Sequence, residues 1–216
     1  MSEGNKWSDD DFLSTLESLE PLTNQDHLFM AADAQTNACL NRFHKEWGLY
    51  AMGFKEAADL LVNHVEEGGI SQDFLVYPVG FLYRHYLELA MKDLIRLGRE
   101  LQYIDEPVPR THNIQRLWGI CRQVLLSAFP DDPTEELDEI ERLIDELSRG
   151  DPKSTAFRYP EETSGSLSLP GIDLINLSGL RQTVHKISLT LEGSCSALEE
   201  ALQYKREIES YHGSEP

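Results

Sequence analysis

The sequence predicts an all-α protein: a helical bundle of about five to six helices, with long antiparallel central helices and one long inter-helix loop. Apolar residues recur at intervals of three and four along most of the chain, which is the spacing of one face of an α-helix. No stretch of useful length alternates between apolar and polar residues, as a half-buried strand would. With 216 residues, 40% of them hydrophobic and 26% charged, the chain can bury a core of ordinary size.

Three regions are expected along the chain. Residues 1–22 are predicted to form an acidic N-terminal extension with a short helix, because Ser8 and the aspartates after it favour a helix start. Residues 23–211 are predicted to form the bundle, and residues 212–216 a disordered tail.

The stretch from Asp73 to Leu101 is the expected centre of the bundle. Apolar residues cover most of its helical circumference, and such a helix is normally surrounded by other helices. The remaining positions form a narrow polar stripe that includes Arg84, His85, Glu88 and Lys92. Arg84, Glu88 and Lys92 follow one another at intervals of four, so their side chains can meet on one helix face.

The other helices are marked by their start and stop residues. The helix before the central one is expected to begin after Asn24 and to end at Gly68-Gly69. A break is expected near residues 47–53, because about forty residues is long for one globular helix. The later helices are expected to begin near Thr111, Asp132 and Asp173.

Charge is distributed unevenly over a chain whose net charge is −19. Residues 131–151 hold ten acidic residues against two arginines, a net of −8. Residues 84–122 hold seven Arg and Lys against five acidic residues, a net of +2. The overall charge opposes non-specific binding to nucleic acid or to an anionic membrane, so an anionic ligand is expected near the second region.

Several classes of protein are not expected. The isolated cysteines Cys39, Cys121 and Cys195 do not suit a disulfide framework or a zinc knuckle. The acidic first residues lack the apolar region of a signal peptide, and no apolar run reaches the roughly 18–20 residues that span a bilayer. A cytoplasmic protein without membrane contact is therefore expected. Glu209 and His212 form the one Glu-x-x-His pair, so neither a metal nor a cofactor is expected.

The polar stripe of the central helix has two interpretations. In the first, Glu88 orients Arg84 and Lys92 toward an anion, and His85 is free for proton transfer. In the second, the stripe is a solvated face or an ion-pair network where the central helix meets its neighbours. The sequence leaves both open.

Three residues outside the stripe are further candidates for ligand binding. His112 lies at a predicted helix N-terminus, where free backbone N–H groups favour an anion, and Arg116 follows one turn later. The pair could approach the stripe, or it could be a surface feature beside a helix cap. Arg158 is either a phosphate or carboxylate clamp, or a tether that holds its loop to an acidic helix.

Arg158 lies in the irregular segment 151–171, between Phe157 and Tyr159. Large aromatic residues in a long loop predict that the segment docks on the bundle or pairs as a short hairpin.

Several sequence blocks occur in a characteristic order: a GG turn, FLYRHYLELAMKDLI, THNIQRLW, FRYP and IDLINLSGL. Together they resemble the all-α HEPN superfamily, in its uncharacterised bacterial and phage-associated branch, over roughly residues 40–205. The resemblance implies a helical bundle that often dimerises and that belongs to toxin–antitoxin, phage-defence or RNA-processing systems. Many members are metal-independent ribonucleases.

Nuclease members of that superfamily carry an Arg followed by four to six residues and a His. Arg206 and His212 fit this pattern, whereas Arg181 and His185 are too close together. Such a pair would supply an imidazole for proton transfer and a guanidinium for the charge of the phosphorane. Arg206 and His212 are six apart, however, and lie on different faces of a continuous helix.

The first functional hypothesis is a HEPN-like module of a bacterial stress or phage-defence system. It would bind nucleotide, RNA or a partner protein from the same operon, and catalysis by Arg84 and His85 or by Arg206 and His212 would make it a metal-independent endoribonuclease. The alternative is an acidic, non-enzymatic interaction protein, antitoxin-like or a nucleic-acid mimic, which the stretch 131–151 favours. The seam of the last helix also predicts a homodimer.

Overall fold

The computed structural model describes residues 21–29, 35–40 and 46–212. The chain divides into two compact units, Met1–His44 and Lys45–Pro216. The short helix expected within residues 1–22 lies outside the described residues, as do residues 213–216 of the expected tail.

The described residues of the first unit form turns and contain no helix. The Asp26 carboxylate accepts hydrogen bonds from the backbone N–H of Thr23 at 2.6 Å and from its hydroxyl at 3.2 Å. Short polar side chains of this kind compete with a helix for backbone hydrogen bonds. The expectation of a helix from Asn24 onward is therefore wrong for residues 25–29 and 35–40, and the described helix begins at Trp47.

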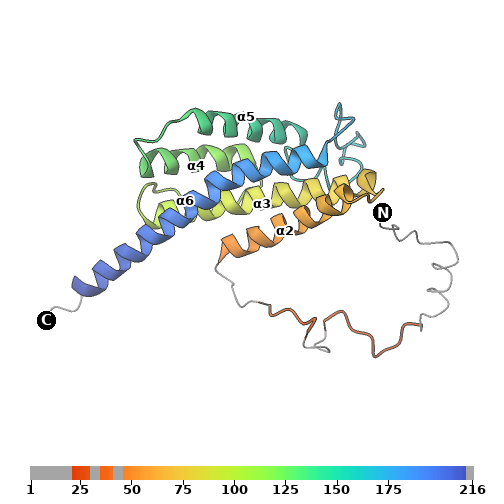
Figure 1. The fold of residues 1–216 in the computed structure, drawn as a ribbon, viewed down its shortest axis with the longest axis horizontal. Helices are drawn as coiled ribbons and strands as arrows, with labels where there is room; N and C mark the ends of the chain where they lie inside the picture. The colour runs from red at the N-terminus through yellow and green to blue at the C-terminus, as the bar shows by residue number, and fades with distance from the viewer. Residues whose placement is uncertain (1–20, 30–34, 41–45, 213–216) are drawn as a thin grey trace. The chain divides into compact units, whose positions relative to one another are not determined.

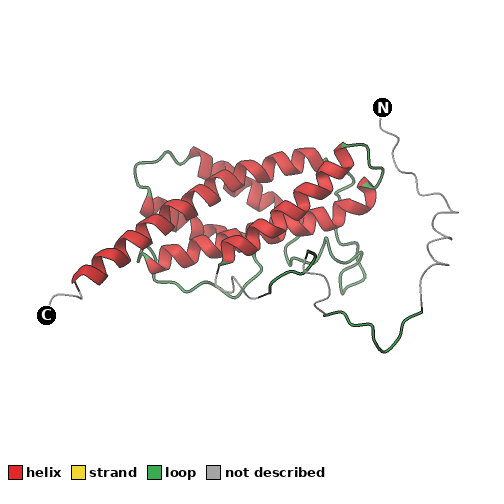
Figure 2. Ribbon diagram, turned by 60° about the horizontal axis from the view of Figure 1, so that its bottom comes forward, coloured by secondary structure: helices red, strands yellow, loops and turns green. Residues whose placement is uncertain are grey.

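The described part of the second unit contains five α-helices, so the all-α prediction is confirmed (Figures 1 and 2). They are α2 (Trp47–Glu66), α3 (Gln72–Glu100), α4 (Ile114–Ala128), α5 (Glu135–Gly150) and α6 (Leu177–His212). Within the described residues there is no strand, and one isolated bridge pairs Glu161 with Leu167. None of the described helices combines the length and the apolar content that a membrane crossing requires.

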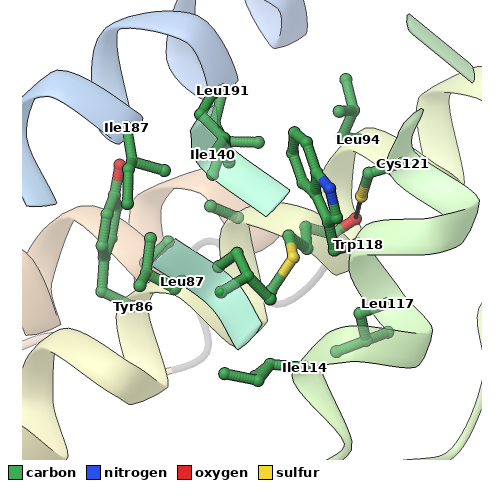
Figure 3. Packing of buried hydrophobic residues seen from close by; sticks show 14 of the residues in the cluster. Tyr86, Leu87, Leu94, Ile114, Leu117, Trp118, Cys121, Ile140, Ile187 and Leu191 are labelled. Atoms are coloured by element: carbon green, nitrogen blue, oxygen red, sulfur yellow. Dashed lines mark hydrogen bonds between the residues drawn. The ribbon is translucent and has the colours of Figure 1, made fainter. Parts of the chain in front are cut away.

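Helix α3 is the centre of the bundle, as its apolar circumference predicts. Helices α2, α4 and α6 pack around it, and α5 packs on α4 (Figure 1). Leu94 of α3, Trp118 of α4 and Leu191 of α6 are all buried in one hydrophobic core (Figure 3). Removing such a side chain typically costs about 2–5 kcal/mol, so this core fixes how the other helices lie against α3.

The helix starts differ slightly from those expected. Ser71 directly precedes α3. The side chain of Asn113 accepts a hydrogen bond from the N–H of Arg116 at the start of α4, and Asn176 accepts one from Gly179 at the start of α6. Thr134 precedes α5 without a side-chain cap. Three starts therefore fall a few residues after those expected, and in α4 and α6 a later residue makes the cap.

The long loop after α5 docks on the bundle, which is one of the two arrangements expected for it. Phe157 is 9% exposed and lies against α3 at Gly80, where an added Cβ would come within 2.4 Å of the phenyl ring. Only glycine permits this approach at position 80 without a shift of the ring or the helix. The contact holds the neighbouring Arg158 beside Phe81 of α3.

Candidate functional site

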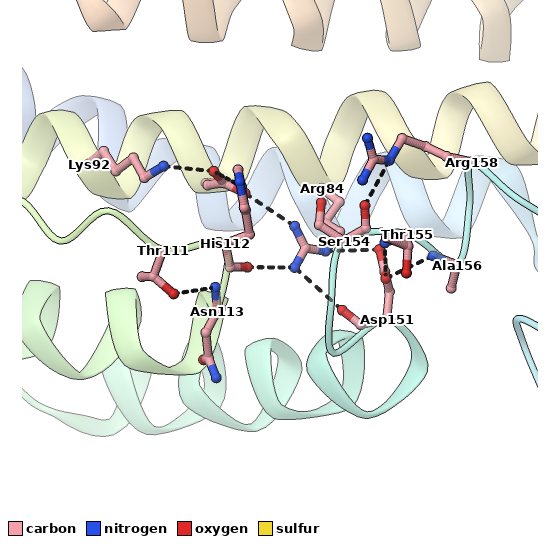
Figure 4. A network of polar contacts seen from close by, with 11 residues as sticks. Arg84, Lys92, Thr111, His112, Asn113, Asp151, Ser154, Thr155, Ala156 and Arg158 are labelled. Carbon is pink, nitrogen blue, oxygen red and sulfur yellow. Dashed lines mark hydrogen bonds and ion pairs between the residues drawn. The ribbon is translucent and has the colours of Figure 1, made fainter. Parts of the chain in front are cut away.

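A polar network lies within the bundle, and Arg84 is at its centre (Figure 4). The Nη1 atom of Arg84 is 3.3 Å from Oε2 of Glu88, one turn along α3, and its Nε atom is 3.0 Å from Oδ2 of Asp151. The Nη2 atom donates to the backbone carbonyls of His112 at 2.8 Å and of Asp151 at 3.4 Å. Arg84 therefore joins α3 to the residues just before α4 and just after α5.

The contact between Arg84 Nε and Asp151 Oδ2 has the distance of an ion pair but not the angle of a hydrogen bond. The contact is therefore stabilised by the attraction of opposite charges and not by a hydrogen bond. The side chains of Arg84 and Asp151 are 0% and 2% exposed, so little water screens the attraction.

Asp151 also shapes the loop that carries Arg158. Its Oδ1 atom accepts hydrogen bonds from the backbone N–H groups of Thr155 at 2.8 Å and Ala156 at 3.0 Å. The Nε of Arg158 donates to the carbonyl of Ser154 at 2.8 Å. One carboxylate thus binds Arg84 with one oxygen and fixes the start of the loop with the other.

Glu88 connects the network to His112. Its Oε1 atom accepts a hydrogen bond from Lys92 Nζ at 2.7 Å and lies 2.9 Å from Nδ1 of His112. Burial alone would raise the pKa of Glu88, but the hydrogen bonds and charges of Lys92 and His112 outweigh burial and lower this pKa.

The contact with Glu88 determines which ring nitrogen of His112 donates a hydrogen bond. An ionised carboxylate can only accept a hydrogen bond, so Nδ1 of His112 carries the proton. When the ring is neutral, Nε2 is its hydrogen-bond acceptor. The His112 side chain is 70% exposed, whereas that of Glu88 is 1% exposed. The pair therefore has a buried carboxylate that orients a largely exposed imidazole, which is an arrangement suited to a general base.

His85 lies in a row of aromatic rings that leads to Arg158. Its ring meets Phe54 edge-on at 4.4 Å between centroids and stacks on Phe81 at 5.7 Å. The guanidinium carbon of Arg158 lies 5.7 Å from the Phe81 centroid and 5.6 Å from that of Tyr159. Cation–π attraction adds about 0.5–1 kcal/mol per contact at such exposed sites and holds Arg158 over the row.

Burial lowers the pKa of both His85 and Arg84. For His85 the charge of Glu88 opposes the shift, while Lys92 and His112 add to it, so the ring is neutral at pH 7. For Arg84 the attraction of Asp151 and Glu88 opposes burial, and a guanidinium stays charged at any accessible pH.

The remaining predicted residues lie apart from this network. Arg116 is exposed in the first turn of α4, where its N–H is bound by Asn113. Arg206 pairs with Glu100 at 3.0 Å near the end of α6. The side chain of His212 lies outside the described residues. In the part of the chain that the structure describes, no group of three or more His, Cys, Asp and Glu side chains could hold a metal ion.

The candidate residues thus divide into two sets. The clamp, defined as Arg84, Glu88 and Asp151, is buried, and its charges are paired within the protein. The outer patch, defined as His112, Arg158 and Tyr159, is exposed, and His112 and Arg158 lie on either side of Arg84 along α3 (Figure 4). The clamp matches the ion-pair interpretation of the stripe, whereas the outer patch is the part of the network that a ligand can reach.

Three contributing residues were not singled out from the sequence: Asp151, Phe54 and Phe81. Asp151 carried a signal, because a carboxylate at the C-terminal end of a helix is opposed by the helix dipole and needs a compensating partner. Phe54 and Phe81 carried none, since apolar residues on amphipathic helices are normally core residues.

No protein-family model, no curated protein and no solved structure matches the chain.

Proposed function

We propose that the chain is a HEPN-like helical module of a bacterial stress or phage-defence system that binds a nucleotide or a short single strand of RNA at the outer patch. The observation that carries the proposal is the clamp: three segments distant in sequence are joined by Arg84, and His112 and Arg158 are thereby held at the surface. A site whose exposed groups are fixed by a buried network loses little entropy when a ligand binds.

Each residue of the patch has a chemical role in this proposal. Arg158 donates from Nε to Ser154, and none of its contacts with described residues is an ion pair, so its terminal nitrogens can donate to a phosphate. Tyr159 is 57% exposed beside it and offers a face on which a base can stack. His112 supplies the acceptor Nε2 and a potential hydrogen bond to a ribose hydroxyl.

The net charge of the chain limits the classes of ligand that can bind. A net charge of −19 repels a long polyanion, and the clamp neutralises Arg84 internally. A ligand with few phosphates meets less of this repulsion than a duplex does. A nucleotide or an oligonucleotide of a few residues is therefore the favoured class.

Binding can be tested with a fluorescein-labelled oligoribonucleotide of about six to eight residues, using anisotropy at fixed ionic strength. Arg158→Ala and His112→Ala are each expected to weaken binding about tenfold, the loss of roughly one charged or stacking contact. Arg116→Ala is the matched control, since Arg116 is exposed on the same protein but outside the patch. Equal affinity of the three variants would contradict the proposal.

Cleavage is the enzymatic form of the same proposal, with His112 as the base in place of the terminal pair. Incubation with total RNA in EDTA should then give products with the wild type and about a hundredfold less with His112→Ala. His85→Ala and His212→Ala test the residues predicted from the sequence. Intact RNA with the wild type would leave binding without catalysis.

An acidic interaction protein is the second candidate, and α5 favours it. Glu139 and Glu146 of this helix are 69% and 67% exposed, within a segment that is rich in acidic residues. Such a surface suits a cationic partner. Failure of the wild type to bind any nucleotide or oligonucleotide, with retention of a cationic partner, would support this candidate against the first.

A further inference from the structure

An apolar groove lies between α5, α6 and the loop that connects them. Its volume is about 560 Å³. Leu143 and Leu147 line it from α5, Leu180 and Thr183 from α6, and Ile172 and Leu174 from the loop. Helix α5 packs mainly on α4, and it also meets α6 through a hydrogen bond from Thr190 to Glu136. We propose that this groove binds a cationic amphipathic helix of another protein.

The edge of the groove exposes large apolar side chains to solvent. Leu174 is 93% exposed and Ile172 is 41% exposed, and both lie beside the partly buried leucines of α5. Fully burying one such side chain contributes about 1.5–3 kcal/mol. A helix whose apolar residues follow the i, i+3, i+4, i+7 pattern would cover this edge and the floor beneath it.

The negative charge beside the groove favours a partner that carries positive charge. Helix α5 carries seven acidic residues against Arg142 and Arg149, a net of −5, and Glu146 lines the groove itself. Asp173 adjoins Leu174 on the loop side. Lysines and arginines that flank the apolar face of a partner helix would lie against these carboxylates.

The same charge disfavours a second copy of this chain as the occupant. A second copy brings a further net charge of −19 toward an acidic surface. Like charges brought together at an interface cost several kcal/mol, so a cationic partner is the better match. None of the three outer-patch residues lines the groove, so the inference does not depend on nucleotide binding.

The probe for the test is a labelled peptide of about 18 residues made of leucine and lysine, with its leucines at helical spacing. Two controls are a scrambled peptide of the same composition and a peptide with glutamate in place of lysine. The amphipathic cationic peptide is expected to bind the full-length protein at least about tenfold more tightly than either control.

Matched variants locate the binding. Leu174→Asp is expected to weaken binding about tenfold, because a carboxylate would then face the apolar side of the peptide. Leu189→Asp is the control, since Leu189 is 60% exposed on α6 and does not line the groove. Equal effects of the two substitutions, or equal binding of the scrambled peptide, would overturn the proposal.

Analytical sedimentation of the protein without peptide tests whether a second copy of the chain occupies the groove. A monomer, or a dimer that Leu174→Asp leaves intact, is the expected result. A dimer that Leu174→Asp dissociates would show that a second copy occupies the groove, and would overturn the proposal.

Discussion

Helices α3 and α5 carry similar ion pairs in different surroundings. In α3, Arg84 and Glu88 are four residues apart, and their side chains are 0% and 1% exposed. In α5, Arg142 and Glu146 have the same spacing, but their side chains are 58% and 67% exposed. The attraction between two charges is weak in water and much stronger where protein excludes water. The comparison shows that helical spacing brings charges together, while burial decides whether the pair is structural.

The sharpest test of this comparison removes one guanidinium from each helix. Arg84→Met is expected to lower the free energy of unfolding by about 3–5 kcal/mol, because Glu88 and Asp151 lose a buried counter-charge. Arg142→Met is the matched control and is expected to change it by less than about 1 kcal/mol. Urea unfolding monitored by circular dichroism measures both. Similar losses for the two variants would break the comparison.

A double variant separates charge from hydrogen bonding within the clamp. Asp151→Asn keeps an oxygen for the N–H groups of Thr155 and Ala156 but removes the charge that faces Arg84. Arg84→Met with Asp151→Asn is therefore expected to cost at least about 1 kcal/mol less than the sum of the two single changes. Simple additivity would mean that the two side chains are not coupled.

The second largest effect on stability is expected at Gly80, which lies beneath Phe157 of the loop after α5. Gly80→Ala is expected to lower the free energy of unfolding by about 1–3 kcal/mol, because its Cβ would meet the ring of Phe157 at 2.4 Å. Gly53→Ala in α2 has nothing within 4 Å and is expected to raise it by about 0.5–1 kcal/mol. Thermal unfolding should therefore move in opposite directions for the two substitutions.

The smallest effect is a pH dependence that reports on the α3 environment. Because burial lowers the pKa of His85, the unfolded chain binds more protons than the folded chain once the pH falls below about 6.5. Stability contributed by the neutral ring is therefore present above that pH and is lost as the pH falls toward the folded-state pKa. His85→Phe should lose less stability than the wild type between pH 7.5 and 5.5 in urea titrations. An identical loss of stability in both proteins would show that groups other than His85 cause the pH dependence.

The spacing of residues within α3 predicted which of its faces is buried. It did not predict which other segments contact the helix. The burial of the helix and the face shared by Arg84, Glu88 and Lys92 followed from spacing alone. The contacts with the His112 carbonyl and with Asp151 did not, because two loops and the packing of α4 and α5 determine them.

The start of α2 shows a different limit of the sequence. Apolar spacing and a possible cap at Asn24 extended the expected helix back to that residue, although the described residues before Trp47 form turns. Periodicity indicates which face of a helix is apolar, but it does not establish that a helix forms.

The division between clamp and outer patch is tested most directly by measuring both stability and oligonucleotide binding for Arg158→Ala. The account predicts about tenfold weaker binding with the free energy of unfolding changed by less than about 1 kcal/mol, because Arg158 is exposed and its contacts in the protein are weak. Unchanged binding, or a loss of stability as large as that expected for Arg84→Met, would contradict it.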